Sequence, residues 1–423
     1  MAPMMQKLLE SVLRGLVKKG RLVVTWPDHS TRSYGPGNWK EAQFAIRDAA
    51  TVKRLLLDPE LAVGESYMDG GLEPLGCDIY DVLEILLANT ASKGPSIMEL
   101  RAKYARFIRR FVQNNTPHRS HRNVAHHYDL NGTLYSMFLD PDRNYSCAYY
   151  ADGAETLEEA QAKKLRHIAA KLRLDRPGLR VLDIGSGWGA MAMYMASEFG
   201  AQVTGVTLST EQLEEARARV AARGLSDRVR FELLDYRKVT GKFDRVVSIG
   251  MFEHVGVPHY KAFFDVVRAR LEPDGLALLH SIGTSGPPAA TNRWLGKYIF
   301  PGGYSPALSE VLPAIEKSGL VATDIEILRL HYAHTLREWR RRFDAKRETI
   351  KGLYDERFCR MFAFYLSGCE LAFRYWGEMN FQIQLMPPEA PMLANRDYMI
   401  DDERKARLPL SQAVPEPQLE AAD

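Results

Sequence analysis

The sequence predicts an α/β protein built on a doubly wound, mostly parallel sheet, with a small α+β domain at the N-terminal end. The sheet is indicated by residues 155–282, where short apolar runs alternate with segments of helical periodicity. A glycine-rich turn, GSGWG at 185–189, directly follows the first apolar run, where doubly wound sheets bind ligands. The α+β domain is indicated by residues 1–95, where short helical runs and strand-like runs such as RLVVTW (21–26) are separated by glycine turns.

The elements of the sheet follow one another at short intervals. The expected strands are RVLDI (180–184), QVTGV (202–206), VRFEL (229–233), DRVVSI (244–249) and GLALLHSI (275–282). The expected helices are 155–174, a helix ending at about Phe199, 209–223 and 258–271. Ser209 or Thr210 is a suitable N-cap for the third of these helices.

The chain after the sheet is less regular. Residues 283–305 are rich in Gly, Pro and aromatic residues, which predicts a lid or pocket wall, with a plain surface loop as the alternative. Residues 306–385 show helical patterns with one strand, 321–328. From Pro387 onward the chain is Pro-rich and charged, and we expect a frayed tail.

Composition narrows the class of protein. The 423 residues are 46% hydrophobic and 26% charged, which is typical of globular chains. With 56 basic and 53 acidic residues, the net charge of +3 does not suggest a nucleic-acid binder. The four cysteines are far apart, which predicts reduced thiols in a cytosolic compartment and no zinc site. No signal peptide and no run of about 18 apolar residues is present, so we expect a protein that is soluble or lies on a membrane surface.

A basic stretch follows the N-terminal domain. From Glu99 to Arg122 there are seven Lys or Arg residues and one acidic residue, and apolar residues at 100–111 fall on one helical face. Such a helix suits an anionic lipid surface, and neutralising Arg106, Arg109 and Arg110 would then weaken binding to liposomes. The alternative is a connector helix that packs between domains and has solvated charges. A second basic patch, Arg337–Lys351, has the same two interpretations.

The glycine-rich turn predicts a nucleotide-type site. Glycines let the backbone turn sharply and approach a ligand, and the carboxylate of Asp183 directly before the loop suits a cationic ligand. The spacing GxGxG, with Gly185 and Gly187, favours S-adenosylmethionine over a dinucleotide, and no Lys-Ser/Thr of a P-loop follows. A tight turn without a ligand is the remaining alternative.

Polar residues at the next strand ends extend this site. Thr207 and Gln212 are placed to contact the ribose or the amino-acid part of the ligand, and Asp235 with Tyr236 is placed to hold adenine. The fourth strand ends in SIGMFEHVG (248–256) instead of the Asn/Asp-Pro-Pro-Tyr turn of amine methyltransferases. A nitrogen acceptor is therefore disfavoured.

Longer strings resemble cyclopropane-fatty-acyl-phospholipid synthases and the related mycolic-acid cyclopropane synthases. The resemblance covers about 120–385, and GESYMDG (64–70) is similar to the N-terminal domain of the bacterial phospholipid enzymes. Ser186 departs from the cysteine common in the family's glycine loop. The matching strings are HYDL (127–130), YSCAYY (145–150), LDIGSGWG, GVTLSTEQ, FDRVVSIGMFEHVG, LLHSIG, YIFPGGY, HYAHTLREW and the helical pattern Met361–Phe373.

The resemblance implies a fold of the class I S-adenosylmethionine-dependent methyltransferase type. It implies transfer of a methylene group from S-adenosylmethionine to a cis double bond of a phospholipid acyl chain, giving a cyclopropane ring and S-adenosylhomocysteine. The implied cofactor contacts, with Asp183 and Asp235 from the residue analysis, are Tyr145, Ser146, Gly185, Gly187, Thr207, Leu208, Gln212, Tyr236 and Ile249.

The resemblance also implies a bound bicarbonate as the base, held by Cys147, Glu253, His280, Ile282 and Tyr332. Tyr332 and His280 are expected to donate hydrogen bonds to it and Glu253 to accept its O–H, with Cys147 and Ile282 contributing mainly backbone groups. His254 is expected to support the loop. Transfer to an alkene leaves a carbocation, so a dry pocket with aromatic faces is needed. The candidates, each with core packing as the alternative, are Tyr149, Tyr150, Phe252, Tyr304, Phe364 and Tyr365.

The expected organisation is an N-terminal lipid or accessory domain (1–98), a basic linker (99–122), a catalytic domain (123–386) and a C-terminal tail (387–423). The expected partners are unsaturated phospholipids in anionic membranes and a second copy of the chain, at the cytoplasmic face of the cell membrane. Three alternatives stay open: a methyl-branch-forming enzyme of the same superfamily, a small-molecule methyltransferase, and a lipid-binding protein without catalysis.

Overall fold

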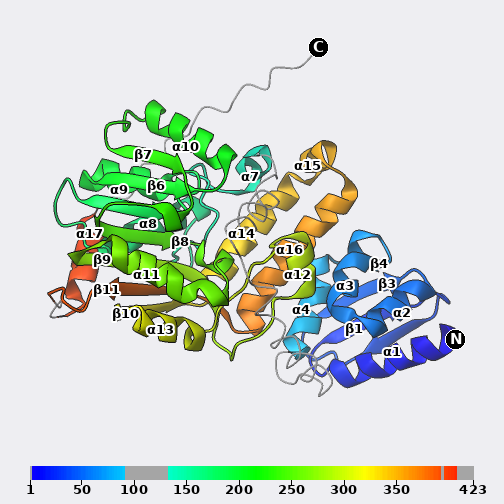
Figure 1. Cartoon of the computed structure of the whole chain (residues 1–423). Coiled ribbons are helices and arrows are strands. Elements are labelled where there is room, and N and C mark those ends of the chain that lie inside the picture. The colour runs from blue at the N-terminus through cyan, green and yellow to red at the C-terminus, as the bar shows by residue number, and fades with distance from the viewer. Residues whose placement is uncertain (1, 91–131, 392–394, 407–423) are drawn as a thin grey trace, which may run out of the picture.

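The computed structural model describes residues 2–90, 132–391 and 395–406. Two bodies lie side by side, a small sheet domain with the N-terminus and a large sheet domain, with long helices between them (Figure 1). The basic stretch 99–122 and the HYDL string lie outside the described residues. Within the described residues, every helix is too short or too polar to cross a bilayer.

The N-terminal region is α+β, as predicted. Its four-stranded sheet has the order β2-β1-β3-β4, and β1 is parallel to β3 and antiparallel to β2. Buried residues alternate along β1 and β3 because one face of the sheet packs on helices. The elements are α1 (Ala2–Leu16), β1 (Arg21–Thr25), β2 (Thr31–Tyr34), β3 (Glu41–Ile46), α2 (Ala49–Leu57), α3 (Pro59–Met68), β4 (Leu72–Pro74) and α4 (Ile79–Thr90).

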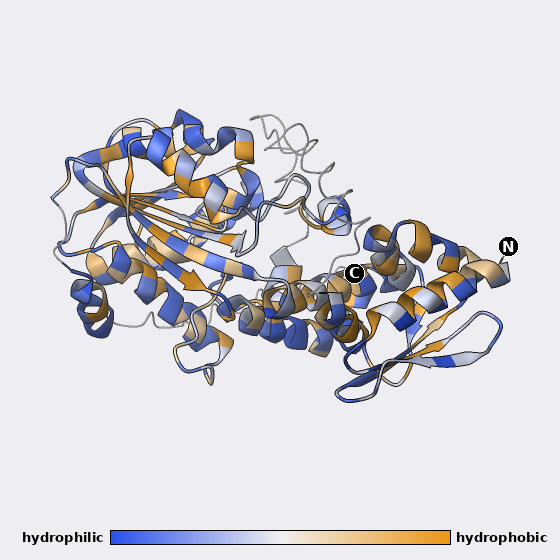
Figure 2. Ribbon diagram, turned by 90° about the horizontal axis from the view of Figure 1, so that it is seen from below, coloured by the Kyte–Doolittle hydropathy of each residue, from blue (hydrophilic) through white to orange (hydrophobic). Residues whose placement is uncertain are grey.

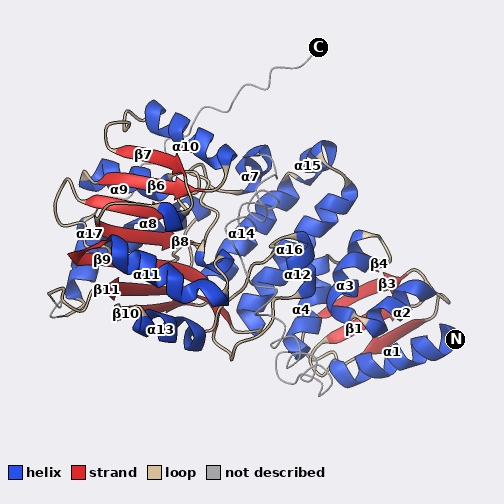
Figure 3. Cartoon of the chain, viewed as in Figure 1, coloured by secondary structure: helices blue, strands red, loops and turns tan. Residues whose placement is uncertain are grey.

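The large sheet has seven strands in the order β10-β11-β9-β8-β5-β6-β7, and Figure 3 shows it apart from the small sheet. The strands β9, β8, β5, β6 and β7 are parallel, while β11 is antiparallel to both neighbours. This confirms the doubly wound, mostly parallel sheet. The strands are β5 (Arg180–Ile184), β6 (Gln202–Thr207), β7 (Val229–Leu233), β8 (Phe243–Ile249), β9 (Leu271–Thr284), β10 (Val321–Leu328) and β11 (Glu378–Met386).

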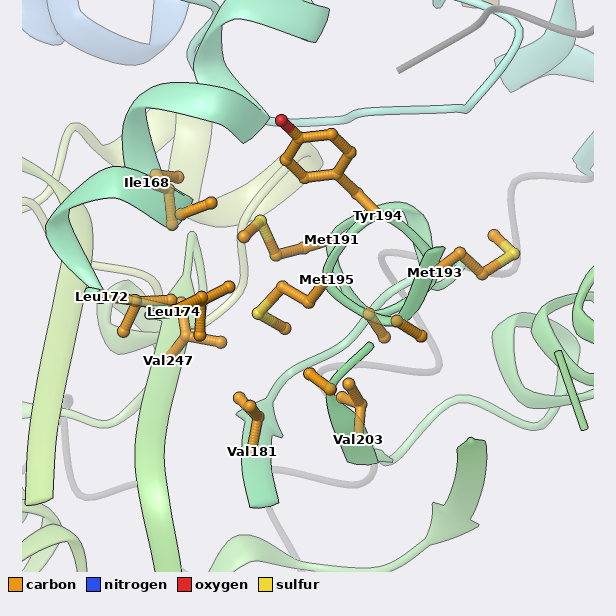
Figure 4. Close-up of a cluster of buried hydrophobic side chains, with 14 of the residues drawn as sticks. Ile168, Leu172, Leu174, Val181, Met191, Met193, Tyr194, Met195, Val203 and Val247 are labelled. Carbon is orange, nitrogen blue, oxygen red and sulfur yellow. The ribbon is translucent and has the colours of Figure 1, made fainter. Parts of the chain in front are cut away.

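Helices cover both faces of this sheet. Successive residues of β5 point to opposite faces, so Val181 joins the core under α8 and α9, whereas Leu182 joins the core under α11 and α13. Figure 4 shows the first of these cores, and Figure 2 shows the strands running through the apolar interior. The helices are α7 (Gly132–Phe138), α8 (Leu157–Lys171), α9 (Ala190–Phe199), α10 (Thr210–Ala222), α11 (Tyr260–Arg270), α12 (Arg293–Tyr298), α13 (Leu308–Lys317), α14 (His331–Ala345), α15 (Arg347–Leu353), α16 (Glu356–Tyr375) and α17 (Asp397–Lys405).

The long helix α16 joins the two domains. It packs on α14 of the large sheet domain and on α3 and α4 of the N-terminal domain (Figure 1). Phe362 and Leu366 lie in a core of the large domain, and Ala363 and Leu371 lie in the N-terminal core. Two apolar faces on one helix therefore hold the domains together.

The segment 283–305, predicted to be a lid or pocket wall, contains α12 and reaches the N-terminal domain. Trp294 is fully buried against Gly64 of α3, where a Cβ would lie 2.4 Å from the indole Nε1. Lys297 donates to Glu65 at 2.6 Å, and Arg293 forms an ion pair with Asp58. The segment is thus a bridge between the domains as well as a loop.

Two expectations for the C-terminal part were wrong. The sequence analysis gave 306–385 only one strand, but β11 is a second one and pairs with both β9 and β10. Its alternate residues are buried amides, so the strand lacks the apolar run that marks its neighbours. The tail predicted from Pro387 is also partly structured, because α17 packs on α8 and Glu403 accepts from His167 at 2.9 Å.

Candidate functional site

The glycine-rich turn connects β5 to α9 and forms one wall of a cavity. Gly185, Gly187 and Gly189 all have positive φ, a conformation that favours glycine. A Cβ on Gly185 would lie 2.7 Å from Met251 Cβ, whereas a Cβ on Gly187 would meet nothing within 4 Å. Gly185 is therefore required for packing, while Gly187 leaves the backbone open to a ligand.

The predicted cofactor residues surround this single cavity. They come from the carboxyl ends of four parallel strands and from the loop before α8, which the sequence separates widely. The predicted residues that line it are Tyr145, Ser146, Asp183, Gly185, Gly187, Thr207, Leu208, Gln212, Asp235, Tyr236 and Ile249. The sequence analysis missed further lining residues, among them Arg143, Lys164, Trp188 and Arg237.

Opposite charges face this cavity from two sides. Asp183 is buried, its Oδ2 has no hydrogen-bond partner among the described residues, and burial raises its pKa to about 7. Lys164 of α8 is also buried, and its Nζ donates to Asn144 Oδ1 at 2.8 Å and Ser146 Oγ at 3.1 Å. Burial lowers the pKa of Lys164 to about 8. An ammonium has three donors and these bonds use two, so the pair suits a ligand with both an ammonium and a carboxylate.

The other strand ends are braced by short hydrogen bonds. Thr207 Oγ1 donates to Gln212 Oε1 at 2.9 Å, and Ser209 is the N-cap of α10, as predicted. Asp235 is held by Arg237, whose Nε and Nη2 donate to the two carboxylate oxygens at 2.8 and 2.7 Å. Because each polar side chain is fixed before a ligand arrives, the site is preorganised.

Glu253 lies just behind the cavity, on a short 3₁₀ turn (Phe252–His254) after β8. Its Oε1 accepts from the backbone N–H of Ile282 at 2.6 Å, while its Oε2 has no partner among the described residues. Burial raises the pKa of Glu253 to about 7. The neighbouring His254, expected only to support the loop, lines the cavity, and burial lowers its pKa to about 4.

Ile282, whose N–H donates to Glu253, lies near the other predicted bicarbonate ligands in sequence or in packing. His280 lies two residues earlier on β9, fully buried, and burial lowers its pKa to about 3. The side chain of Ile282 packs on an apolar cluster that contains Cys147 and Tyr332. Burial raises the pKa of the Cys147 thiol, which therefore stays protonated and is not a nucleophile.

Aromatic side chains fill this cluster. Tyr332 contacts Trp339 and Phe373, and the hydroxyls of Tyr145 and Tyr365 lie 2.7 Å apart. Tyr145 packs on the cluster and also lines the cofactor cavity, so the cluster and the cavity adjoin. The result is a buried, aromatic-rich region next to the cavity.

Only part of the predicted aromatic set lies in this region. Tyr365 and Tyr150 belong to the cluster, whereas Phe252 packs on Tyr260 and the phenyl rings of α11. Tyr149 stacks on His167 and His331, and Tyr304 donates to Glu310 at 2.6 Å. Phe364 packs on Trp294 and borders both this cluster and the N-terminal core. For Phe252, Tyr149 and Tyr304 the alternative, structural packing, describes their contacts.

Comparison with known proteins decides the family. A family model described as mycolic acid cyclopropane synthetase matches residues 115–383, well over half of the chain. The chain belongs to this family. A second model, described as a domain of unknown function (DUF7884), matches residues 8–95.

Curated relatives and a solved structure match a large part of the chain. The chain is 41% identical to the cyclopropane-fatty-acyl-phospholipid synthase of Escherichia coli over 79% of this chain and 85% of that protein. It is 34% identical to the tuberculostearic acid methyltransferase UfaA1 of Mycobacterium tuberculosis, over 78% and 80% of the two chains. The solved structure of the mycolic acid cyclopropane synthase CmaA1 with S-adenosylhomocysteine (SAH) and CTAB has a TM-score of 0.59 at 33% identity, and covers 63% of this chain and 97% of that one. The chain is thus an S-adenosylmethionine-dependent methyltransferase of the cyclopropane synthase family.

Proposed function

We propose that this enzyme transfers a methylene group from S-adenosylmethionine to the cis double bond of unsaturated acyl chains in membrane phospholipids, giving cyclopropane fatty acids. The observation that supports this most is the buried carboxyl of Glu253, whose Oε2 has no partner among the described residues. Its neighbour His254 lines the cofactor cavity, and Ile282, whose N–H it accepts from, packs on the aromatic cluster. A nitrogen or oxygen methyltransferase needs no such dry region, because its acceptor is already a nucleophile.

The cavity fits S-adenosylmethionine by charge and shape. Asp183 is placed to accept from the ligand's ammonium, Lys164 to donate to its carboxylate, and the open backbone at Gly187 to lie along it. With the sulfonium held there, proximity to the double bond lowers the activation barrier by several kcal/mol. The alkene π electrons form the new C–C bond as the C–S bond breaks, which leaves a carbocation on the acyl chain.

The aromatic cluster protects that carbocation. Tyr145, Tyr365 and Trp339 contribute aromatic rings, with Tyr145 stacked on Trp339, and the quadrupoles of such rings tolerate positive charge. The buried surroundings exclude water that would trap the cation. Loss of one proton from the added methyl group then closes the ring.

The polar groups behind the cavity fit a bound bicarbonate, which would supply a small anionic base for that proton. In this proposal Glu253 Oε2, which has no partner among the described residues, accepts the O–H of bicarbonate, and Tyr332 and His280 donate to its oxygens. The Ile282 N–H donates to Glu253, so in this structure it orients the carboxylate. With a pKa of about 7, about half of the Glu253 side chains are carboxylates at pH 7, and this fraction rises at higher pH.

An exposed apolar stripe on α1 supports binding to a lipid surface. Met4, Leu8 and Val12 recur every four residues and are 68, 57 and 49% exposed, and the exposed Lys7 and Arg14 flank them. An apolar stripe with basic neighbours suits the surface of an anionic bilayer. We propose that the enzyme binds there, at the cytoplasmic face of the cell membrane, as a homodimer that gains avidity from two such helices.

The test is product analysis with two variants. Purified protein with S-adenosylmethionine and unsaturated phosphatidylglycerol vesicles should add one CH2 to acyl chains that then resist hydrogenation. Glu253→Gln and Tyr332→Phe should bind the cofactor normally by calorimetry but lose at least about 100-fold in rate. Wild-type rates in both variants would refute the proposed roles.

A second candidate is addition of a methyl branch, which the similarity to UfaA1 favours. The same cation would undergo a hydride shift and lose a proton, giving a methylene branch that a separate reductase with a hydride donor would saturate. Resistance to hydrogenation separates cyclopropane from the methylene branch, which has the same mass, and mass spectrometry separates it from the saturated branch, which contains two more hydrogens.

A further inference from the structure

His280 is held from the neighbouring strand β11 by two amides. Gln382 lies directly opposite His280 in the strand pairing, and its Nε2 is 3.0 Å from the ring Nδ1. Asn380 lies two residues earlier on the same face, and its Nδ2 is 3.4 Å from the ring Nε2. All three side chains are at most 1% exposed.

Lys171 fixes the direction of the Gln382 amide. The Lys171 Nζ donates to Gln382 Oε1 at 2.7 Å, and an ammonium has donors only. Lys171 is itself held by an ion pair with Glu326, which also accepts from His167 Nε2 at 2.7 Å. Because Oε1 must face Lys171, the Nε2 of Gln382 must face His280 and donate to it.

We propose that Gln382 and Lys171 are positioning residues that keep His280 in the tautomer with its proton on Nε2. A ring nitrogen that accepts a hydrogen bond carries no proton, so Nδ1 is bare and the neutral ring is protonated at Nε2. The assignment requires the Asn380 amide to be turned, because its Nδ2 faces Nε2 in the structure and two N–H groups cannot hydrogen-bond each other. After a half turn its Oδ1, which has no partner among the described residues, accepts from the Nε2 proton.

The fixed tautomer defines what His280 does in the reaction. On its Nε2 side the ring offers one proton and no lone pair, so it does not remove a proton from the substrate, and an anion bound there competes with Asn380 Oδ1 for that proton. This rests on the proposed function, in which the proton goes to bicarbonate. The tautomer itself is a property of the free protein.

The test is the tautomer of His280 in Gln382→Glu. A carboxylate at this position accepts from both Lys171 and the imidazole, so the ring must carry a proton on Nδ1. Gln384→Glu is the matched control, because Gln384 lies on the same face of β11 but bonds Lys171 O and Tyr398 instead of His280. Two-bond ¹⁵N–¹H correlation spectra of ¹⁵N-histidine protein read the tautomer, and His280→Gln assigns the signal.

We expect the Nε2-protonated pattern in the wild type and in Gln384→Glu, and a proton on Nδ1 in Gln382→Glu. The kcat of Gln382→Glu should fall about 10- to 100-fold while its affinity for S-adenosylmethionine stays unchanged. A wild-type ring protonated on Nδ1, or a spectrum unchanged by Gln382→Glu, would overturn the proposal. If that variant does not fold, Lys171→Met is the second test, because it frees the Gln382 amide to turn and should give a mixture of tautomers. A single unchanged tautomer in Lys171→Met would contradict the proposal.

The spectra are recorded without lipid or bicarbonate. If they show the expected tautomers but product formation does not depend on bicarbonate, the proposed function fails and the role of Gln382 in fixing His280 stands.

Discussion

The protonation of Glu253 is expected to determine how the activity of the enzyme depends on pH. Burial raises its pKa to about 7, and the proposed role requires the carboxylate. We therefore expect kcat/KM to rise with pH through an apparent pKa near 7. Rates in buffers from about pH 5.5 to 8.5 at fixed bicarbonate concentration measure this, and a rate that is flat across that range would contradict it.

Stability provides an independent check on the same carboxyl. The folded protein holds this proton more tightly than the unfolded chain, whose Glu pKa is 4.5, so this residue makes the free energy of unfolding fall as pH rises from about 4.5 to 7. Over this range the free energy of unfolding falls by about 3 kcal/mol at most because of this residue. The difference in the free energy of unfolding between Glu253→Gln and the wild type, measured by denaturant unfolding, should therefore favour the variant more at pH 8 than at pH 5.

The glycine turn between β5 and α9 separates binding from folding. Gly187→Ala places a methyl group in open space at a φ of 54°, so we expect about 1 kcal/mol of strain and at least tenfold weaker cofactor binding. Gly185→Ala forces a methyl group against Met251 Cβ and should instead lower the melting temperature sharply. Calorimetric titration and thermal unfolding of both variants measure these effects. Cofactor binding by Gly187→Ala at the wild-type affinity would contradict the account.

The strands that could be predicted from sequence are those whose buried residues are mostly apolar. β5 and β8 are buried along most of their length and are rich in Val, Leu and Ile, and their ends agree with prediction to within a residue. β11 was missed although its apolar residues Met379, Phe381, Ile383 and Leu385 alternate strictly, which is the period of a strand. Its polar face is buried by contacts with α8 and β9 that only the fold creates. For the same reason, Lys164 and Gln382 could not be recognised as parts of the site.

The whole molecule combines a catalytic domain with a domain that carries the apolar stripe of α1. Replacing Met4, Leu8 and Val12 with Ser should reduce affinity for phosphatidylglycerol vesicles at least about tenfold, because three large apolar contacts are lost. Leu353→Ser is the matched control, since Leu353 is 53% exposed but lies on α15 of the catalytic domain. Vesicle cosedimentation measures both, and equal losses would exclude a specific role for α1.

The domain arrangement was only partly accessible from sequence. The pattern of residues 1–95 predicts a separate α+β region, but the long helix α16 and the bridge from Trp294 to Gly64 depend on contacts between residues more than two hundred positions apart. The division of the chain at 98, 122 and 386 stays a prediction.

The most direct test of the account is the rate of ring formation as bicarbonate is removed. Purified enzyme, S-adenosylmethionine and unsaturated phosphatidylglycerol vesicles are combined in carbonate-depleted buffer, and bicarbonate is then added back while cyclopropane acyl chains are quantified by gas chromatography. We predict a rate close to zero that rises to saturation with added bicarbonate. Full activity without bicarbonate, or no cyclopropane at any concentration, would contradict the account.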